Sequence, residues 1–222
     1  MFATADADSR LRKQAASAEV RWTEVAGDVV AAVADTVTPQ GLVAVCRFLD
    51  VTLDQVVTSD ARMVVVGVDV RDPGNAGALL RCADGAGADG VVLSGESVDP
   101  YNPKVVRASA GSLFHLPVTV HPDLPSLAAA ARTAGLQVLA ADGSAPTDLD
   151  HAERRGLLGR PTAWLFGNEA YGLPAAVREL ADETVSVPLY GRAESLNLAT
   201  AAAVCLYASA RARRLAERGP DQ

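Results

Sequence analysis

Residues Met63 to Gly95 read MVVVGVDVRDPGNAGALLRCADGAGADGVVLSG. The stretch begins and ends with short, valine-rich apolar runs, which are typical of buried strands, and the residues between them have the composition of a helix. The turn at residues 72–75, Asp-Pro-Gly-Asn, ends the first run and would open the helix, with Asn75 as its N-cap. This part of the chain therefore predicts a strand, a helix and a second strand.

The same alternation continues toward the carboxyl terminus. Helical segments separate most of the later short apolar runs, which are LPVTV (116–120), LQVLAA (136–141), TAWLFG (162–167) and TVSVPL (184–189). A long alanine-rich helix is expected from about Leu198 to Arg218. Near-continuous apolar strands that alternate with helices predict an α/β fold, in which helices cover both faces of a parallel sheet.

Residues 1–58 differ from this pattern and are expected to form a separate, partial α/β domain, followed by the larger domain at 59–222. The first residues are helical in composition and rich in alanine. Pro39 and Gly41 then punctuate a turn before an apolar run of strand type.

One glycine pattern has to be rejected as a nucleotide site. Residues 85–90 read GAGADG and satisfy the G-x-G-x-x-G pattern, but they follow a predicted helix and precede a predicted strand. Dinucleotide binding requires the reverse order, because the pyrophosphate binds at the amino end of a helix. These glycines are therefore interpreted as helix C-cap and turn residues.

Composition excludes several classes of function. The chain has 222 residues and a net charge of −7, which argues against a general nucleic-acid binder and requires any RNA contact to be local. No transmembrane span or secretory signal is recognised, so a cytoplasmic protein without membrane contact is expected. The three cysteines are expected to be buried free thiols, and the three histidines lack the spacing of metal ligands.

Polar residues stand where three of the predicted strands end, which is where open α/β sheets bind ligands. Asn75 and Arg81 belong to the first segment, Gly167-Asn168-Glu169 to the second, and residues 194–197, Glu-Ser-Leu-Asn, to the third. Each also has an ordinary structural interpretation. Asn75, Ser195 or Asn197 could cap a helix, Arg81 could form an ion pair or extend into solvent, and residues 167–169 could be a surface turn.

The three segments together resemble the motifs of the SpoU/TrmH family of RNA ribose 2′-O-methyltransferases. The resemblance covers roughly residues 60–217 and includes Tyr101 to Lys104 and Arg107 to Ser112. It implies the trefoil-knotted fold of the SPOUT superfamily, in which the knot forms the pocket for S-adenosylmethionine (AdoMet). It also implies a homodimer that joins the two sites through the last helix and the first helix of the knotted domain.

The resemblance assigns residues to two groups. The cofactor site would comprise Gly167, Val187, Leu189 and Leu196. The polar catalytic positions would be Asn75, Arg81, Glu169, Ser195 and Asn197.

These residue types suit methyl transfer to a ribose hydroxyl. The reaction mainly requires that the nucleophile be positioned and that its proton be removed, and it needs no metal. A guanidinium is almost always protonated, so Arg81 is expected to hold a phosphate and stabilise the developing alkoxide rather than to act as the base. Asn75 and Ser195 would orient Arg81 and the ribose, Asn197 would brace its loop, and Glu169 would hold the Asn75 turn or the substrate.

In many members of the family a substrate domain of about a hundred residues precedes the catalytic part, and residues 34–45 resemble its end. The first elements of that domain are therefore expected to be missing here, and RNA contacts would fall to residues such as Lys104, Arg107 and Arg192. Ribosomal RNA is the expected substrate and transfer RNA the alternative. A non-catalytic RNA-binding or assembly factor that keeps the fold is the competing hypothesis.

Overall fold

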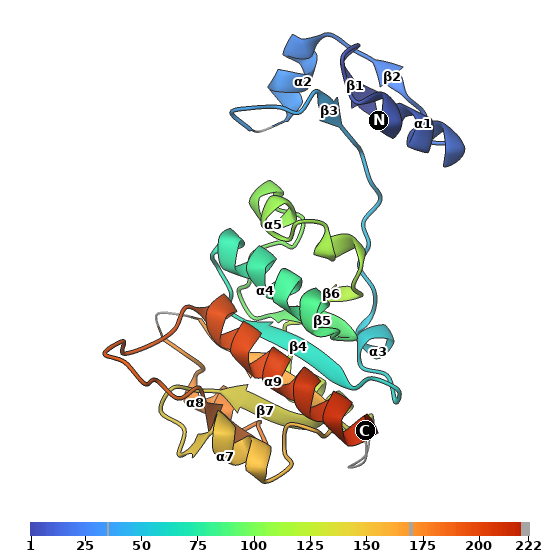
Figure 1. Cartoon of the computed structure of the whole chain (residues 1–222). Coiled ribbons are helices and arrows are strands. Elements are labelled where there is room, and N and C mark those ends of the chain that lie inside the picture. Colours follow the sequence, from blue (N-terminus) through green and yellow to red (C-terminus); the bar gives the residue numbers. More distant parts are fainter. Residues whose placement is uncertain (35, 169–170, 219–222) are drawn as a thin grey trace. The chain divides into compact units, whose positions relative to one another are not determined.

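The computed structural model describes residues 1–34, 36–168 and 171–218. The chain divides into two compact units, Met1–Phe48 and Leu49–Gln222 (Figure 1). The boundary lies before residue 58, where the first domain was expected to end. Helix α3 (Leu53–Val56) belongs to the larger unit, because Val56 is buried in its core and the N–H of Val51 donates to the carbonyl of Val118 at 3.1 Å.

The first unit contains five short elements. They are β1 (Phe2–Ala3), α1 (Ser9–Ser17), β2 (Thr23–Glu24), α2 (Gly27–Val33) and β3 (Leu42–Val43). Strand β1 lies in the centre of the sheet, parallel to β2 and antiparallel to β3. Gly41 has a φ of +72° and makes the turn that was expected before β3. The unit therefore begins with a strand rather than with the helix that its composition predicted.

The larger unit is built on a seven-stranded sheet, and every strand pair in it is parallel. Its order is β6-β5-β4-β9-β7-β10-β8. The strands are β4 (Met63–Val68), β5 (Gly90–Ser94), β6 (Val118–Val120), β7 (Gln137–Ala141), β8 (Thr147–Asp148), β9 (Thr162–Phe166) and β10 (Glu183–Ser186). The parallel sheet is confirmed, and β8 is an additional short edge strand.

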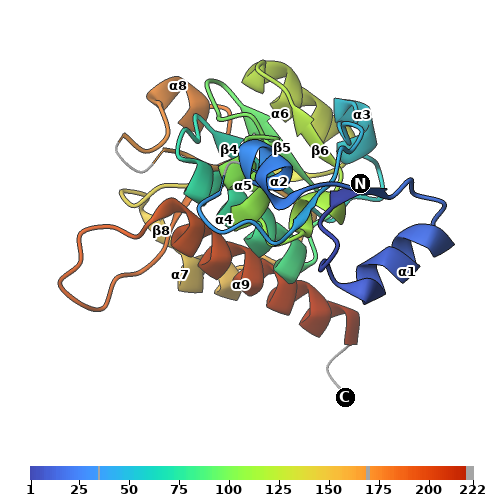
Figure 2. The ribbon, with the colours of Figure 1, turned by 90° about the horizontal axis from the view of Figure 1, so that it is seen from above.

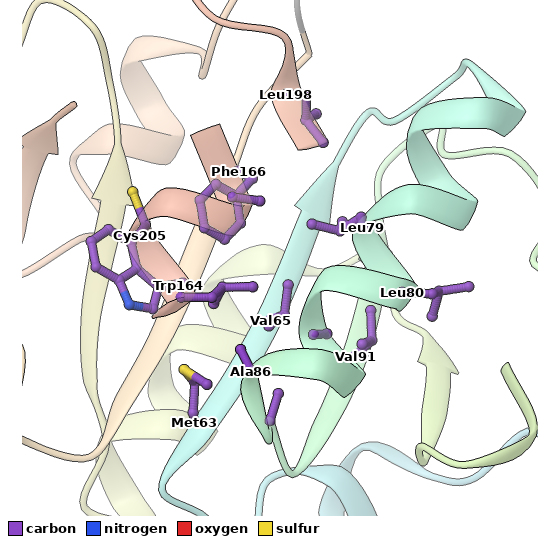
Figure 3. Close-up of a cluster of buried hydrophobic side chains, with 14 of the residues drawn as sticks. Met63, Val65, Leu79, Leu80, Ala86, Val91, Trp164, Phe166, Leu198 and Cys205 are labelled. Carbon is purple, nitrogen blue, oxygen red and sulfur yellow. The ribbon is translucent and has the colours of Figure 1, made fainter. Parts of the chain in front are cut away.

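Helices cover both faces of this sheet, as expected (Figures 1 and 2). The remaining helices are α4 (Pro73–Ala86), α5 (Pro103–Ala108), α6 (Leu124–Thr133), α7 (Leu149–Arg154), α8 (Ala175–Arg178) and α9 (Leu198–Arg218), with a 3₁₀ turn at Ser112–Phe114. Val65 and Trp164 point to the face covered by α4 and α9 (Figure 3). Val64 and Leu165 belong to the opposite core, with Leu127 of α6.

The ends of α4 differ from the prediction in one respect. Asp72, not Asn75, is the N-cap, and its Oδ1 accepts the N–H of Asn75 at 2.8 Å. Pro73 explains the difference, because proline lacks an N–H and suits the first helical position, so the cap must precede it. Gly87, with a φ of +73°, is the C-cap, whereas Gly85 lies within the helix. The helix thus precedes β5, as the rejection of the dinucleotide pattern required.

The cysteines are only partly as expected. Among the described residues all three are free, but Cys46 is exposed, because it lies in the extended segment after β3 rather than in a buried strand. Cys82 is half-buried, and burial raises the pKa of the Cys205 thiol to about 12. A thiol with that pKa is not a nucleophile at neutral pH.

Two features are absent from the described residues. None of their helices is both long enough and apolar enough to cross a bilayer. They also contain no group of three or more histidine, cysteine, aspartate or glutamate residues placed to hold a metal ion.

Candidate active site

Four neighbouring strands end at one edge of the large sheet and hold the loops of the candidate site. In the order β4-β9-β7-β10, no two adjacent strands are consecutive in the chain. The chain continues from β4 to β5 and β6 on one side of β4, whereas β9, β7 and β10 lie on its other side. The loops that follow β4 and β9 therefore separate at a topological switch point, where open α/β sheets bind their ligands.

A cavity of about 390 Å³ lies at the carboxyl ends of β7, β9 and β10. This volume is within the range of small-molecule sites, roughly 300–1,000 Å³. Its lining residues are Ala141, Asp142, Gly143, Phe166, Gly167, Asn168, Gly172, Val185, Ser186, Val187, Pro188, Leu189, Glu194, Ser195, Leu196, Leu198 and Ala201. The four residues expected at the cofactor site are all among them, and so is Ser195.

Gly167 is required by a close approach of backbone. A Cβ at this position would lie 2.5 Å from the carbonyl carbon of Gly172 and 2.6 Å from the backbone nitrogen of Leu173. The N–H of Gly172 donates to the carbonyl of Asn168 at 2.8 Å, which folds the segment back on itself. The turn that follows β9 therefore tolerates no side chain at residue 167.

Asn168 joins this turn to the end of β4. Its Nδ2 donates to the carbonyl of Asp69 at 3.1 Å. Asp69 has a φ of +53°, a left-handed conformation that aspartate tolerates better than most residues, and its Oδ1 accepts the N–H of Glu96 at 2.8 Å. Glu169, expected at the catalytic site, lies outside the described residues.

Asp142 presents a carboxylate to the cavity from the end of β7. Its Oδ1 accepts the N–H of Ser144 at 2.8 Å and the hydroxyl of Ser144 at 2.7 Å, while Arg178 Nη1 donates to Oδ2 at 2.9 Å. Burial acts to raise the pKa of Asp142, but the bonds from Ser144 and Arg178 outweigh it, and the pKa is lowered. The carboxylate is therefore ionised at neutral pH.

Asn197 organises the loop between β10 and α9. Its Oδ1 accepts the N–H groups of Ala199 at 3.0 Å and Thr200 at 3.3 Å, so it caps α9, whereas Ser195 is exposed. The Nδ2 of Asn197 donates to Oδ1 of Asn75 at 2.8 Å. Two of the expected catalytic residues therefore form a pair that connects the first and third segments.

Tyr190 holds the same loop from the other side. Its hydroxyl donates to Oδ2 of Asp150 in α7 at 2.9 Å. The carboxylate of Asp150 raises the pKa of this tyrosine, because it stabilises the protonated hydroxyl. The loop is thus attached at Tyr190 and at Asn197, and the residues between them border the cavity.

Arg81 stands apart from the cavity, on the outer face of α4. Six helical positions separate it from Asn75, which corresponds to a rise of about 9 Å along an ideal helix, and no hydrogen bond joins the two described side chains. Its neighbour Cys82 contacts Ala199 of α9 through a 3.6 Å hydrogen bond. The opposite flank of α4 meets α5, because a Cβ on Gly77 would lie 2.4 Å from that of Ala108.

Arg81 is therefore exposed between two flanking helices. It forms no ion pair or hydrogen bond with any described residue, which disfavours the structural ion pair considered above. Its charge acts locally to lower the pKa of Cys82, although burial raises that pKa by more.

Sequence reasoning missed Asp142, Asn168 and Glu194 as residues that border the cavity. Asp142 could have been found, because it is the first polar residue after the predicted strand 136–141, at the same edge as the other three segments. Asn168 and Glu194 lie within segments that were recognised, but no role was assigned to them.

Comparison with known proteins identifies the family. The sequence profile of the SpoU rRNA Methylase family matches residues 62–207. The 23S rRNA (guanosine(2553)-2′-O)-methyltransferase RlmP of Bacillus subtilis is 39% identical over 183 residues, which are 81% of this chain and 68% of that protein. The 23S rRNA (uridine(2479)-2′-O)-methyltransferase of Streptomyces viridochromogenes is 37% identical over 79% of this chain and 61% of that protein. The chain thus spans about two thirds of these relatives.

The fold also matches solved structures. The crystal structure of the SpoU methyltransferase AviRb from Streptomyces viridochromogenes in complex with AdoMet superposes with a TM-score of 0.80 at 29% identity, covering 96% of this chain and 82% of that one. The profile match includes all four loops at the carboxyl edge and the first half of α9. The chain belongs to the SpoU rRNA methylase family.

Proposed function

We propose that this protein transfers a methyl group from AdoMet to a ribose 2′-hydroxyl of ribosomal RNA. The observation that carries the proposal is the cavity at the carboxyl edge, where Gly167, Val187, Leu189 and Leu196 lie together beside the Asn75–Asn197 pair. Two of the relatives described above are named as 2′-O-methyltransferases of 23S rRNA, and the AviRb structure contains AdoMet.

The cavity fits AdoMet in size and in chemistry. Its walls include the apolar side chains of Phe166, Val187 and Leu196, which suit a purine ring, and they also expose the backbone of loops. The absence of a side chain at Gly167 keeps the turn after β9 tight against this space. Bound there, AdoMet would supply a methyl group that its sulfonium activates toward a nucleophile.

The residues of the chain would then position the ribose and help to remove its proton. The Asn75–Asn197 bond fixes the start of α4 relative to the loop that carries Ser195, and the Ser195 hydroxyl would orient the nucleotide. Arg81, whose guanidinium pairs with no described residue, would bind the phosphate of the target nucleotide and stabilise the alkoxide. The proton would leave through that phosphate or through water, and Glu169 would hold the substrate or the Asn75 turn.

RNA would be held by both units of the chain. In the larger unit, Lys104 and Arg107 of α5 and Arg192 of the loop before α9 are exposed basic side chains. We propose that Met1–Phe48 is a substrate-binding domain, with Arg12 and Lys13 exposed on α1. With ribosomal RNA as its substrate, the protein would act in the cytoplasm.

A homodimer would form through α9. Val204, Tyr207 and Leu215 are 39%, 55% and 60% exposed, and they lie on one stripe of the helix at intervals of three, eight and eleven residues. Two grooves, of about 710 Å³ and 300 Å³, border this stripe. Arg211 forms an ion pair with Glu153 at 2.8 Å, which gives this arginine a structural role within the same region.

The test is methyl transfer by the purified protein. Radiolabelled AdoMet and ribosomal RNA from a strain that lacks the gene are expected to give a labelled RNA, and mapping is expected to find a single 2′-O-methyl in it. Label in transfer RNA alone would replace the proposed substrate. AdoMet binding without transfer to any cellular RNA would favour the assembly factor, and absence of AdoMet binding at millimolar ligand would overturn the proposal.

A further inference from the structure

We infer that Glu194 is a specificity-determining residue, which makes the cavity prefer the positively charged AdoMet to its neutral demethylated product, S-adenosylhomocysteine. This inference rests on the proposed function, because it requires that the cavity be the AdoMet site. The two ligands share every group except one methyl and the positive charge at sulfur. Contacts to the adenine, the ribose or the amino acid therefore bind both, and only a feature that senses the methyl group or the sulfur charge distinguishes them.

The charges around the cavity favour a cation. Of the described residues that line it, only Asp142 and Glu194 are ionisable, and both are acids. Asp142 is paired with Arg178 at 2.9 Å, so these two charges largely cancel at a distance. Glu194 has no ion-pair or hydrogen-bond partner among the described residues. Among the described lining residues, Glu194 is therefore the one that carries an unpaired charge.

The amino end of α9 opposes this effect but is weaker. Leu198 lines the cavity, and a helix begins there with a partial charge of roughly +0.5. Asn197 accepts two of the free N–H groups, which reduces the exposed part of that charge. A full negative charge on Glu194 exceeds it, and Arg192, the basic residue of the same loop, does not line the cavity. The described lining residues therefore give the cavity a net negative charge.

Glu194 belongs to a loop that is anchored on both sides. It lies between Tyr190, which is bonded to Asp150, and Asn197, which is bonded to Asn75. The carboxylate therefore belongs to a loop that is anchored at both ends beside the cavity.

The size of the effect follows from Coulomb's law. Unit charges separated by about 8 Å, at an effective dielectric constant between those of a protein surface and water, change a binding constant by about 3- to 10-fold. A preference of this size for AdoMet would reduce product inhibition. The neutral product lacks the positive charge that Glu194 attracts, so it would dissociate more readily.

The experiment is calorimetry of the full chain with three ligands. They are AdoMet, S-adenosylhomocysteine and sinefungin, in which a protonated amine carries the positive charge near the place of the sulfonium. Glu194→Gln keeps the shape of the side chain and removes its charge. Asp60→Asn is the matched control, because Asp60 is an exposed acid before the amino end of β4, at the opposite edge of the sheet.

Glu194→Gln is expected to weaken AdoMet and sinefungin about 3- to 10-fold and to leave S-adenosylhomocysteine within about 2-fold of the wild type. Asp60→Asn should change none of them. Raising the salt from 0.05 M to 0.5 M should reduce the wild-type preference for AdoMet, because salt screens the exposed carboxylate.

Two results would overturn the inference while leaving the proposed function intact. Equal losses for all three ligands would show that Glu194 holds a group they share, and unchanged affinities would show that its charge does not reach the sulfur. If the wild type bound none of the ligands, the proposed function would fail and this inference with it.

Discussion

The side chains of Asn197 and Asn75 form a hydrogen bond of 2.8 Å between residues that lie 122 positions apart in the chain. Asn197 caps α9 with its oxygen and uses its nitrogen for this bond, so one side chain both begins a helix and connects two loops of the site. The start of α4 is held independently by Asp72, which leaves the Asn75 side chain available. The pair therefore couples the geometry of the site to the amino end of α9.

The two asparagines should respond differently to truncation. Asn197→Ala removes the cap and the bond, and we expect it to lower the free energy of unfolding by about 1–2 kcal/mol. Asn75→Ala removes only the bond, and its cost should be about 0.5 kcal/mol. Both variants should lose methyl transfer, and urea denaturation measures the difference in stability. Equal losses of stability would mean that the cap contributes nothing.

Several features of the fold could be predicted from the sequence, because they depend on local patterns. Six of the seven strands and the bounds of α9 follow from valine-rich runs and an alanine-rich stretch. The N-cap of α4 was assigned to Asn75 because the preference of Pro73 for the first helical position was overlooked. The start of the larger unit at Leu49 depends on burial of Val56 against distant strands, which no local pattern reveals.

Sequence patterns predicted which residues belong to the site but not which contacts they make. Loops at the ends of parallel strands meet at one edge, so Gly167, Val187 and Leu196 could be expected together. The partner of Asn75 depends on a hydrogen bond between segments far apart in the chain. The knot expected from the family likeness concerns chain threading, which strand order alone does not define, and it stays a prediction.

Gly167→Ala should damage both the cofactor site and the fold. Its Cβ would lie within 2.6 Å of backbone atoms of Gly172 and Leu173, which cannot rotate away as a side chain would. We expect AdoMet affinity to fall by at least ~10-fold and stability by about 1–3 kcal/mol, the usual cost of overpacking. Gly191→Ala is the control, because a Cβ there meets nothing within 4 Å. Calorimetry and thermal unfolding compare them, and normal AdoMet binding by Gly167→Ala would refute the close approach.

Asp142 should contribute to stability at neutral pH and lose that contribution in acid. Its pKa is lowered in the folded state, so the folded protein binds a proton less readily than the unfolded chain does. The contribution is therefore complete above the pKa of an unfolded aspartate, about 3.9, and disappears as pH falls through the lower folded value. Asp142→Asn should flatten the decline of stability below about pH 5. Denaturation curves from pH 3 to 7 test this, and an unchanged decline would contradict it.

A charge introduced into the exposed stripe of α9 (Val204, Tyr207 and Leu215) should convert the proposed dimer into a monomer. Val204→Asp would bury a carboxylate in an interface that is apolar at this point, and such a charge is costly without a partner. Ala129→Asp on α6 adds the same charge to the opposite face of the sheet and should leave the dimer intact. Light scattering at micromolar concentration measures the mass. A monomeric wild type would reject the dimer.

Arg81 should matter for catalysis and hardly at all for folding. It is exposed and pairs with no described residue, so Arg81→Ala should leave the free energy of unfolding within about 0.5 kcal/mol of the wild type. Methyl transfer should nevertheless fall at least ~100-fold, the scale of a lost positioned catalytic group, while AdoMet affinity stays nearly unchanged because Arg81 does not line the cavity.

Two further variants separate the charge of Arg81 from its shape. Arg81→Lys keeps the charge but cannot bind a phosphate through two parallel N–H groups, and we expect it to recover only part of the activity. Arg160→Ala removes the same charge from the amino edge of the sheet, before β9, and should stay active. Single-turnover transfer with saturating AdoMet measures all three variants. An active Arg81→Ala, or a loss matched by unfolding, would show that the guanidinium does not act on the substrate.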